Sequence, residues 1–153
     1  MIAIDPGASG GIAIRKLMSV EAHSMPKTDS DVVTALAEAL PQDRVSTAGE
    51  SAYLEELVKY TGRNMPSSAM AVYASNWGII KGALIAMGFR IIMVPPKKWQ
   101  AALGLGSAKG LSKTEWKNKL KQRAQELFPE IDVTLATADA LLILEAAYRG
   151  HLG

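Results

Sequence analysis

Apolar residues recur along the chain in patterns that predict an alternation of strands and helices. Residues 1–5, "MIAID", form the short apolar run of a buried strand. Residues 10–25 predict a hairpin of two strands, because their apolar positions, Leu17 among them, nearly alternate. Residues 29–40 combine capping residues at the start, a helical apolar period and a stop at Pro41, so they predict a helix.

The remainder of the chain predicts two more strands and four more helices. Residues 44–58 are expected to form a strand that ends near Glu55, with a helix as the alternative. Residues 67–87 have the apolar pattern of a long helix capped by Ser67 or Ser68. The same reasoning predicts a strand and three helices further on, at residues 89–94, 96–105, 113–128 and 136–149. Strands that alternate with helices in this way indicate an α/β fold.

Length and composition limit the class of protein. At 153 residues and 48% hydrophobic content the chain suffices for one well-filled core, so residues 1–153 are expected to form a single domain. The chain contains no cysteine, which excludes disulfides and thiolate metal sites. No apolar run reaches the roughly 18 residues of a membrane span and no signal-type segment is present, so a cytoplasmic protein is expected.

The net charge of +2 hides an uneven distribution of charge. Residues 1–76 hold nine acidic side chains against six Lys or Arg, whereas residues 77–128 hold ten Lys or Arg against two Glu. This clustering is typical of a protein that binds a polyanion, most simply a nucleic acid backbone, with a solvated helix face as the alternative. The candidate DNA-binding side chains are Lys97, Lys98, Lys109, Lys113, Lys117 and Lys121.

Two tryptophans, Trp99 and Trp116, lie within this basic segment. Their indole rings offer stacking surfaces for bases. Tryptophan at helical spacing among apolar residues is nevertheless more typical of a protein core, and this is the interpretation that we favour.

The first predicted strand ends in a carboxylate and a glycine-rich turn, "DPGASGG". An acid at a strand end followed by glycines suits metal and phosphate binding, because glycines let both groups approach the backbone closely. The alternative is an ordinary Asp-Pro-Gly turn, in which Asp5 bonds its own backbone. The motif alone leaves both interpretations of Asp5 open.

A second carboxylate, Asp139, begins an otherwise apolar run in the last predicted helix. Burying a carboxylate without a partner costs several kcal/mol, so Asp139 is expected to cap the helix, form an ion pair or bind a metal. Glu50, Glu55 and Glu56 lie near a predicted strand, and if that strand neighbours the first one, one of them meets Asp5 and Asp139. Three such acids are suited to holding Mg²⁺ or Mn²⁺ for phosphodiester hydrolysis.

Four stretches of the chain together resemble one family. They are "AIDPGASGG", "SNWGIIKGALIAMGFRIIMVPPKKWQAALGLG", "SKTEWKNKLKQRAQELFPE" and "ADALLILEAA". In this order they resemble the RuvC-type Holliday junction resolvases, especially the small phage-encoded members, within the RNase H-like (retroviral integrase) superfamily. The resemblance covers nearly the whole chain.

The resemblance implies an RNase H-like fold, with a central mixed five-stranded sheet flanked by helices. It further implies a homodimer that binds four-way DNA junctions and cuts them by paired symmetric nicks, with Mg²⁺ or Mn²⁺ as cofactor. Such a protein serves DNA recombination and repair and is associated with the nucleoid of a bacterial or phage-infected cell.

When the family's functional positions are matched to this chain one residue at a time, the resemblance also implies a metal-binding catalytic site. Its metal ligands are Asp5, Glu55 and Asp139, with Glu56 and Asp132 as alternatives. Lys113 matches a basic position that the family places near the scissile phosphate, and it is therefore a candidate catalytic residue.

One position departs from the pattern of the family. Cellular members have a second Asp three residues before the terminal one, where this chain has Ala136. Two hypotheses follow: a junction endonuclease that uses three carboxylates, or a protein of the same fold that binds branched DNA with weak or no cleavage. A third, an ATP-handling enzyme of the actin-like class, shares the Asp-x-Gly turn but requires a duplicated domain that this chain is too short to hold.

Overall fold

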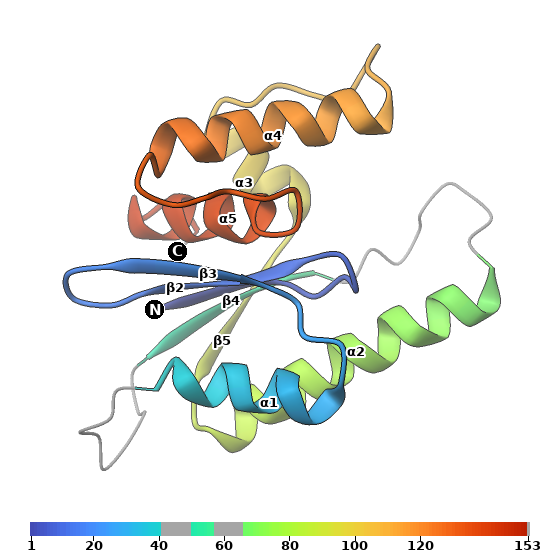
Figure 1. The fold of residues 1–153 in the computed structure, drawn as a ribbon, viewed down its shortest axis with the longest axis vertical. Coiled ribbons are helices and arrows are strands. Elements are labelled where there is room, and N and C mark those ends of the chain that lie inside the picture. Colours follow the sequence, from blue (N-terminus) through green and yellow to red (C-terminus); the bar gives the residue numbers. More distant parts are fainter. Residues whose placement is uncertain (41–49, 57–65, 153) are drawn as a thin grey trace.

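The computed structural model describes residues 1–40, 50–56 and 66–152, which form a sheet between two layers of helices (Figure 1). The elements are β1 (Ile2–Asp5), β2 (Gly11–Arg15), β3 (Val20–Ser24), α1 (Asp29–Glu38), β4 (Ser51–Glu55), α2 (Ser67–Ala86), β5 (Arg90–Val94), α3 (Pro96–Ala102), α4 (Lys113–Leu127) and α5 (Ala138–Tyr148). The sheet order is β3-β2-β1-β4-β5. The predicted α/β fold is confirmed.

The sheet is mixed, as expected. β1 pairs antiparallel with β2, which pairs antiparallel with β3, and this is the predicted hairpin. β1 also pairs parallel with β4, and β4 pairs parallel with β5. The strand predicted to end near Glu55 is confirmed and its helical alternative is wrong. β1 and β4 are therefore neighbours whose carboxyl ends meet at one edge of the sheet.

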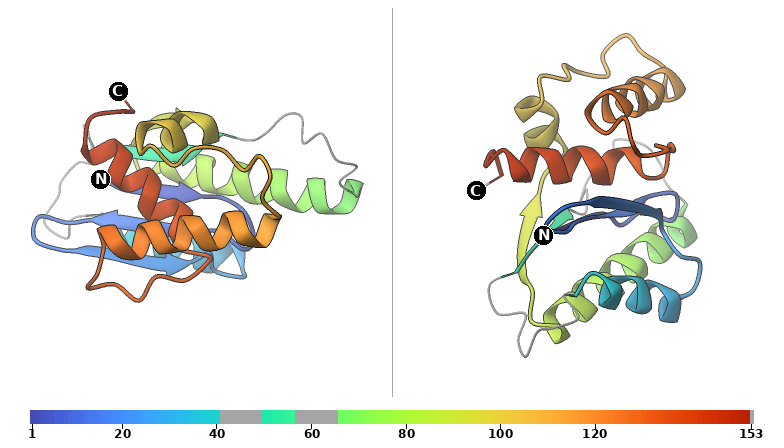
Figure 2. Two further views of the ribbon diagram at one scale, coloured as in Figure 1. Left: turned by 90° about the horizontal axis from the view of Figure 1, so that it is seen from above. Right: turned by 60° about the vertical axis from the view of Figure 1, so that its left-hand side comes forward.

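Helices cover both faces of the sheet (Figure 2), and each face has its own hydrophobic core. Ala3 of β1 and Tyr53 of β4 belong to the cluster that also contains residues of α3, α4 and α5. Ile4 and Leu54 belong to the opposite cluster, with residues of α1 and α2. Since side chains alternate along a strand, the next residues after Ile4 and Leu54 face the α3–α5 layer. Those next residues are the acids at the two strand ends.

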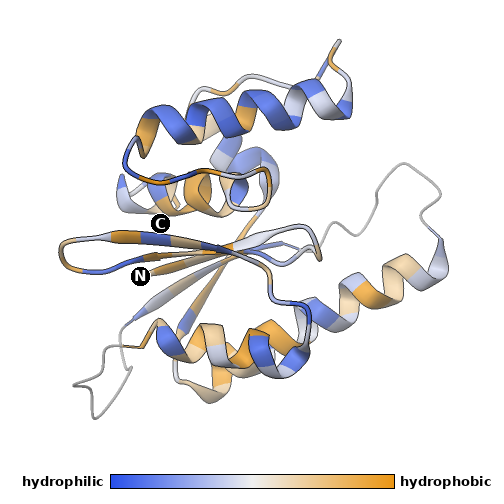
Figure 3. Ribbon diagram, in the orientation of Figure 1, coloured by the Kyte–Doolittle hydropathy of each residue, from blue (hydrophilic) through white to orange (hydrophobic). Residues whose placement is uncertain are grey.

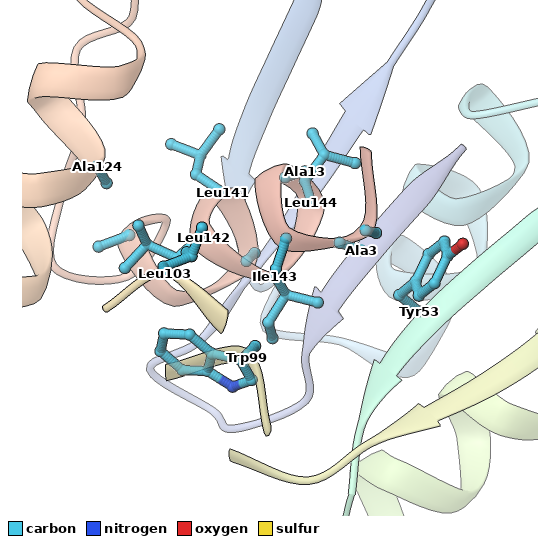
Figure 4. Close-up of a cluster of buried hydrophobic side chains, with 14 of the residues drawn as sticks. Ala3, Ala13, Tyr53, Trp99, Leu103, Ala124, Leu141, Leu142, Ile143 and Leu144 are labelled. Atoms are coloured by element: carbon cyan, nitrogen blue, oxygen red, sulfur yellow. The ribbon is translucent and has the colours of Figure 1, made fainter. Parts of the chain in front are cut away.

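The last helix, α5, lies between the sheet and α4 (Figure 1). Nine of its eleven residues are buried, so both of its faces are covered. Its side chains Leu141, Leu142, Ile143 and Leu144 occupy the middle of the larger cluster, which Figure 4 shows. A buried helix of this kind holds its first turn firmly against the sheet edge.

Two details differ from the sequence predictions. Pro66 has extended backbone (φ −52°, ψ 139°) and is the N-cap of α2, so Ser67 and Ser68 lie inside the first turn and neither caps it. Leu17 is 98% exposed because it lies in the turn between β2 and β3 rather than on a strand. Pro41, predicted to stop α1, lies outside the described residues.

None of the helices in the described ranges combines the length and the hydrophobicity that crossing a lipid bilayer requires.

Candidate metal centre

Asp5 and Glu55 end neighbouring parallel strands at the same level. Ile2 pairs with Ala52 and the register continues to Ile4 with Leu54, so Asp5 and Glu55 follow side by side. Neighbouring strands lie about 4.8 Å apart, and both side chains face the α3–α5 layer. The sheet thus brings together two of the three acids that the resemblance selected.

The third acid, Asp139, is the second residue of α5 and only 6% exposed. It is not the N-cap, which is Thr137, so the capping interpretation is wrong. Its Oδ2 atom accepts a hydrogen bond from Lys117 Nζ at 2.5 Å. Its Oδ1 atom is buried and, within the described residues, has no hydrogen-bond partner. A buried carboxylate oxygen without a partner is an available ligand for a cation.

Two glycines allow this convergence. A Cβ atom on Gly10 would lie 2.3 Å from the Asp5 main-chain oxygen and 2.7 Å from its Cγ atom. A Cβ atom on Gly11 would lie 2.7 Å from the Ala136 main-chain oxygen, just before α5. The sequence predicted that these glycines leave room for a ligand. The structure shows that they leave room for Asp5 and for the residues just before α5. The turn interpretation of Asp5 also holds, because its Oδ1 accepts the N–H of Gly7 at 3.1 Å.

The carboxylates disfavour one another's charge. Burial, and then the charges of Asp5 and Asp139, raise the pKa of Glu55 to about 8. Burial and the charge of Asp139 likewise raise the pKa of Asp5, although the Gly7 N–H and Lys117 oppose the shift. Such raised values indicate a site with an excess of negative charge, which a cation would relieve.

Lys117, rather than Lys113, is the lysine at the acids. Burial lowers its pKa, but the ion pair and hydrogen bond with Asp139 outweigh this, and the net pKa is raised. Lys113 is exposed at the first turn of α4, so its catalytic role stays a prediction. The sequence had a signal for Lys117: it precedes the buried Leu120 and Ala124 by three and seven residues, which places it on the inward face of α4.

Other side chains anchor this edge of the sheet, and the sequence analysis did not foresee them. Asn76 Nδ2, from α2, donates to the Pro6 main-chain oxygen at 3.3 Å, next to Asp5. Trp77 Nε1 donates to the Glu55 main-chain oxygen at 3.2 Å. Tyr73, also from α2, lies close enough that burial and then the charges of Glu55 and Asp5 raise its pKa to about 12. The middle of α2 thus holds both strand ends.

The alternative acids lie elsewhere. Glu50 Oε2 pairs with the Met1 amino group at 2.9 Å, at the opposite end of β4. Glu56 follows the strand, and its N–H donates to the Val94 main-chain oxygen at 2.9 Å. Asp132 is exposed in the segment that precedes α5. Of the candidate middle ligands, Glu55 is the one that interacts electrostatically with both Asp5 and Asp139.

The basic segment supplies exposed charge on the same side of the sheet. Hydrophilic residues are spread along α4 (Figure 3). Of the lysines predicted to bind DNA, the exposed ones are Lys97, Lys98, Lys109 and Lys113. Lys121 is half-buried, and Lys98 Nζ donates to the Leu152 main-chain oxygen. Trp99 is fully buried, which confirms that it is a core residue, and Trp116 is partly buried against the same cluster.

The donor set fits a hard divalent cation. Asp5, Glu55 and Asp139 offer only oxygen ligands, which Mg²⁺ prefers, and Asp139 Oδ1 is unpartnered within the described residues. As they are arranged, however, no three Asp, Glu or His side chains among the described residues form a group that could hold a metal ion. The cation that the structure places at the acids is the ammonium group of Lys117, which pairs with Asp139.

Comparison with known proteins identifies the architecture. No family model and no curated protein matches the chain. A structure of Thermus thermophilus RuvC is similar, with a TM-score of 0.56 and 15% identity over 99% of this chain and 98% of that one. A second structure, of T. thermophilus RuvC in complex with a Holliday junction substrate, has a TM-score of 0.60 and 17% identity, covering 100% and 97%. The chain has the RuvC fold.

Both alignments with the RuvC structures span nearly all of each chain. In this chain, Ala136 lies in the turn before α5, and its main-chain oxygen packs near Gly11. Its methyl side chain offers no ligand atom. The carboxylates that the structure places at this edge of the sheet are those of Asp5, Glu55 and Asp139.

The burial of Glu55 and the negative charges beside it predict a stability that falls with rising pH when no metal is present. The pKa of Glu55 is about 8 in the folded protein against an ordinary 4.5, so the folded state binds this proton more tightly. Its stabilising contribution is complete below about pH 4.5 and is lost as the pH rises through about 8. Between about pH 5 and pH 8.5 the wild-type melting temperature should fall about 5–10 °C more than that of Glu55→Gln.

Differential scanning fluorimetry in EDTA measures this difference, and excess Mg²⁺ should restore the wild-type melting temperature at the higher pH. Parallel pH profiles for the wild type and Glu55→Gln would contradict the assignment of the proton to Glu55.

Proposed function

We propose that this chain is a metal-dependent endonuclease that cuts four-way DNA junctions by paired nicks. The observation that carries the proposal is the convergence of three carboxylates, Asp5, Glu55 and Asp139, at one edge of a RuvC fold. The basic segment beside this edge supports a nucleic acid substrate. The Holliday junction bound in one of the similar structures supports a branched DNA substrate.

The residues of the proposed site are three acids and one lysine, Lys117. Mg²⁺ or Mn²⁺, when bound, supplies Lewis acidity and a hydroxide at neutral pH. Asp5, Glu55 and Asp139 would hold the ion, and Glu55 would do so as the ionised carboxylate, a form that a nearby positive charge favours. Lys117 remains protonated beside Asp139 and offers a positive charge to a phosphate. Burial of the acids keeps these interactions in a medium of low dielectric constant, where they are stronger than in water.

The exposed lysines should give binding its salt dependence. The triple variant Lys97→Gln, Lys109→Gln, Lys113→Gln is expected to bind a junction more weakly at every salt concentration. The slope of log Kd against log salt should fall by about 0.9 for each phosphate that the variant no longer neutralises. Fluorescence anisotropy of a labelled junction in Ca²⁺ measures the Kd at each salt concentration. Lys16→Gln is the control, because Lys16 pairs with Glu21 at 2.8 Å at the far hairpin; an equal slope change there would contradict this assignment.

A homodimer is part of the proposal, and α2 supplies the apolar surface for it. The helix is predominantly hydrophobic, yet Ile80 and Leu84 are its only buried residues, while Val72 is 60% and Ile85 61% exposed. Figure 1 shows the first half of α2 extending past the sheet. Val72→Asp is expected to raise the dimer dissociation constant at least about tenfold, as measured by sedimentation equilibrium. A monomeric wild type at micromolar concentration would contradict it.

One assay tests the nuclease. Purified protein is incubated with an end-labelled four-way junction or with a linear duplex of the same sequence, in Mg²⁺, in Mn²⁺ and in EDTA. The expected result is paired symmetric nicks in the junction alone, only when a metal is present. Tight junction binding without nicks in either metal would instead support a branched-DNA binding protein, a role that the Lys117–Asp139 pair favours. Equal cutting of the duplex would contradict junction specificity.

A further inference from the structure

Two indole groups from different helices hold Glu55. Trp77 Nε1, from α2, donates to the Glu55 main-chain oxygen at 3.2 Å and thereby fixes the end of β4. Trp99 Nε1, from α3, donates to the carboxylate oxygen Oε1 at 3.1 Å. Among the hydrogen bonds of the described residues, the Trp99 bond is the one that acts on the Glu55 carboxylate itself. The position of the strand end and the orientation of the carboxylate thus have separate anchors.

Trp99 is itself held rigidly. Its side chain is fully buried in the cluster that contains Leu103 and Ile143 (Figure 4). α3 follows β5 directly, through Pro95 and Pro96, whose rings restrict the backbone. Because Val94 pairs with Glu55 in the sheet, this short connection places the first turns of α3 beside the end of β4. The indole therefore has little freedom to follow a moving carboxylate.

The chemistry of this contact is specific. A buried indole N–H needs an acceptor, and a carboxylate is a stronger acceptor than a main-chain carbonyl because of its charge. A packing role alone would not require the N–H group.

We propose that Trp99 is a positioning residue, whose indole N–H orients the Glu55 carboxylate for the divalent ion. The inference rests on the function proposed above, in which Glu55 is a ligand. Outer partners that donate to a ligating carboxylate fix its rotation, and their loss typically lowers metal affinity or activity about 10- to 100-fold. Through this hydrogen bond, the core cluster that contains Trp99 would position a ligand of the metal centre.

A single-atom replacement tests the inference. Site-specific incorporation of 3-benzothienylalanine at position 99 replaces the indole N–H with sulfur and keeps the shape of the ring. Calorimetric titration with MnCl₂ in the absence of DNA is expected to show about tenfold weaker binding than wild type. The same replacement at Trp116, for which the described residues show no contact with the acids, is the matched control and should leave the affinity unchanged. Trp99→Phe is a second variant, for use where it folds.

A second readout needs no replacement at all. In a ¹⁵N-labelled wild-type sample, titration with Mg²⁺ should move the indole Nε1–H resonance of Trp99 and leave that of Trp116 in place. Unchanged Mn²⁺ affinity in the benzothienylalanine variant overturns the inference, as does a wild type that binds no Mn²⁺. A wild type that binds Mn²⁺ with the expected dependence on Trp99 but cuts no junction contradicts the nuclease proposal and supports the positioning role.

Discussion

Glu55→Gln is expected to lower junction cleavage about 100- to 1,000-fold, because a ligand to a catalytic ion contributes several kcal/mol to transition-state stabilisation. Glutamine keeps the size of the side chain and can still accept the Trp99 hydrogen bond through its amide oxygen. Since Glu55 is protonated in the metal-free protein at neutral pH, its neutral analogue should fold at least as well as wild type. Single-turnover cleavage in Mg²⁺ measures the loss, and thermal melting in EDTA checks the fold.

Glu56→Gln is the matched control for this loss. Glu56 is the adjacent acid, and the contact that the structure shows for it is made by its main-chain N–H. Its variant is expected to stay within about twofold of wild-type cleavage, as for an ordinary peripheral substitution. Cleavage that survives in Glu55→Gln and disappears in Glu56→Gln would contradict the assignment of the middle ligand.

Gly10→Ala is expected to impair both stability and cleavage. Its Cβ atom would lie 2.3 Å from the Asp5 main-chain oxygen, closer than real Cβ atoms approach, so the end of β1 must shift. Overpacking of this kind destabilises by about 1–3 kcal/mol. Displacement of a catalytic group by about 1 Å lowers the rate about 100-fold. Chemical denaturation and single-turnover cleavage of the junction measure the two effects.

Gly82→Ala is also a glycine-to-alanine substitution, but it is expected to stabilise the protein. Gly82 lies inside α2, and a Cβ atom there would meet nothing within 4 Å. Because alanine favours the helix over glycine, this variant should be stabilised by about 0.5–1 kcal/mol. If Gly10→Ala behaved like Gly82→Ala, the close packing of Gly10 against Asp5 would be wrong.

Local patterns were enough to predict the elements, and they marked Asp5 and Asp139 as candidate ligands without deciding between metal binding and a turn, a cap or an ion pair. The apolar runs and turn residues located each strand of the described residues, and the carboxylate that ends β1 was visible as an exception within them. Predicting Glu55 required a further fact, that β4 lies beside β1, which no local pattern contains. The sequence could state this only as a condition, and the resemblance selected Glu55 by its match to the family. The parallel register of β1 and β4 gives the physical reason that Asp5 and Glu55 are neighbours.

The partners of the acids were harder to predict. Lys117 and Trp99 were noted as a basic and an aromatic residue, but their contacts depend on how α3 and α4 pack against α5. For Lys117 the spacing to Leu120 and Ala124 was a usable local signal. For Trp99 there was none, because a buried tryptophan in a core looks the same in sequence whether or not its N–H meets a carboxylate.

The register of β4 also limits how this gene can change. A one-residue deletion or insertion between Ser51 and Leu54 would leave every acid in the sequence, yet it would turn Glu55 to the opposite face of the sheet, among the apolar residues of α1 and α2. Substitutions in the strand can be conservative, whereas length changes cannot. Related genes that encode the proposed activity should therefore align without gaps across β4, which would make the absence of gaps there a more sensitive marker of an intact site than sequence identity.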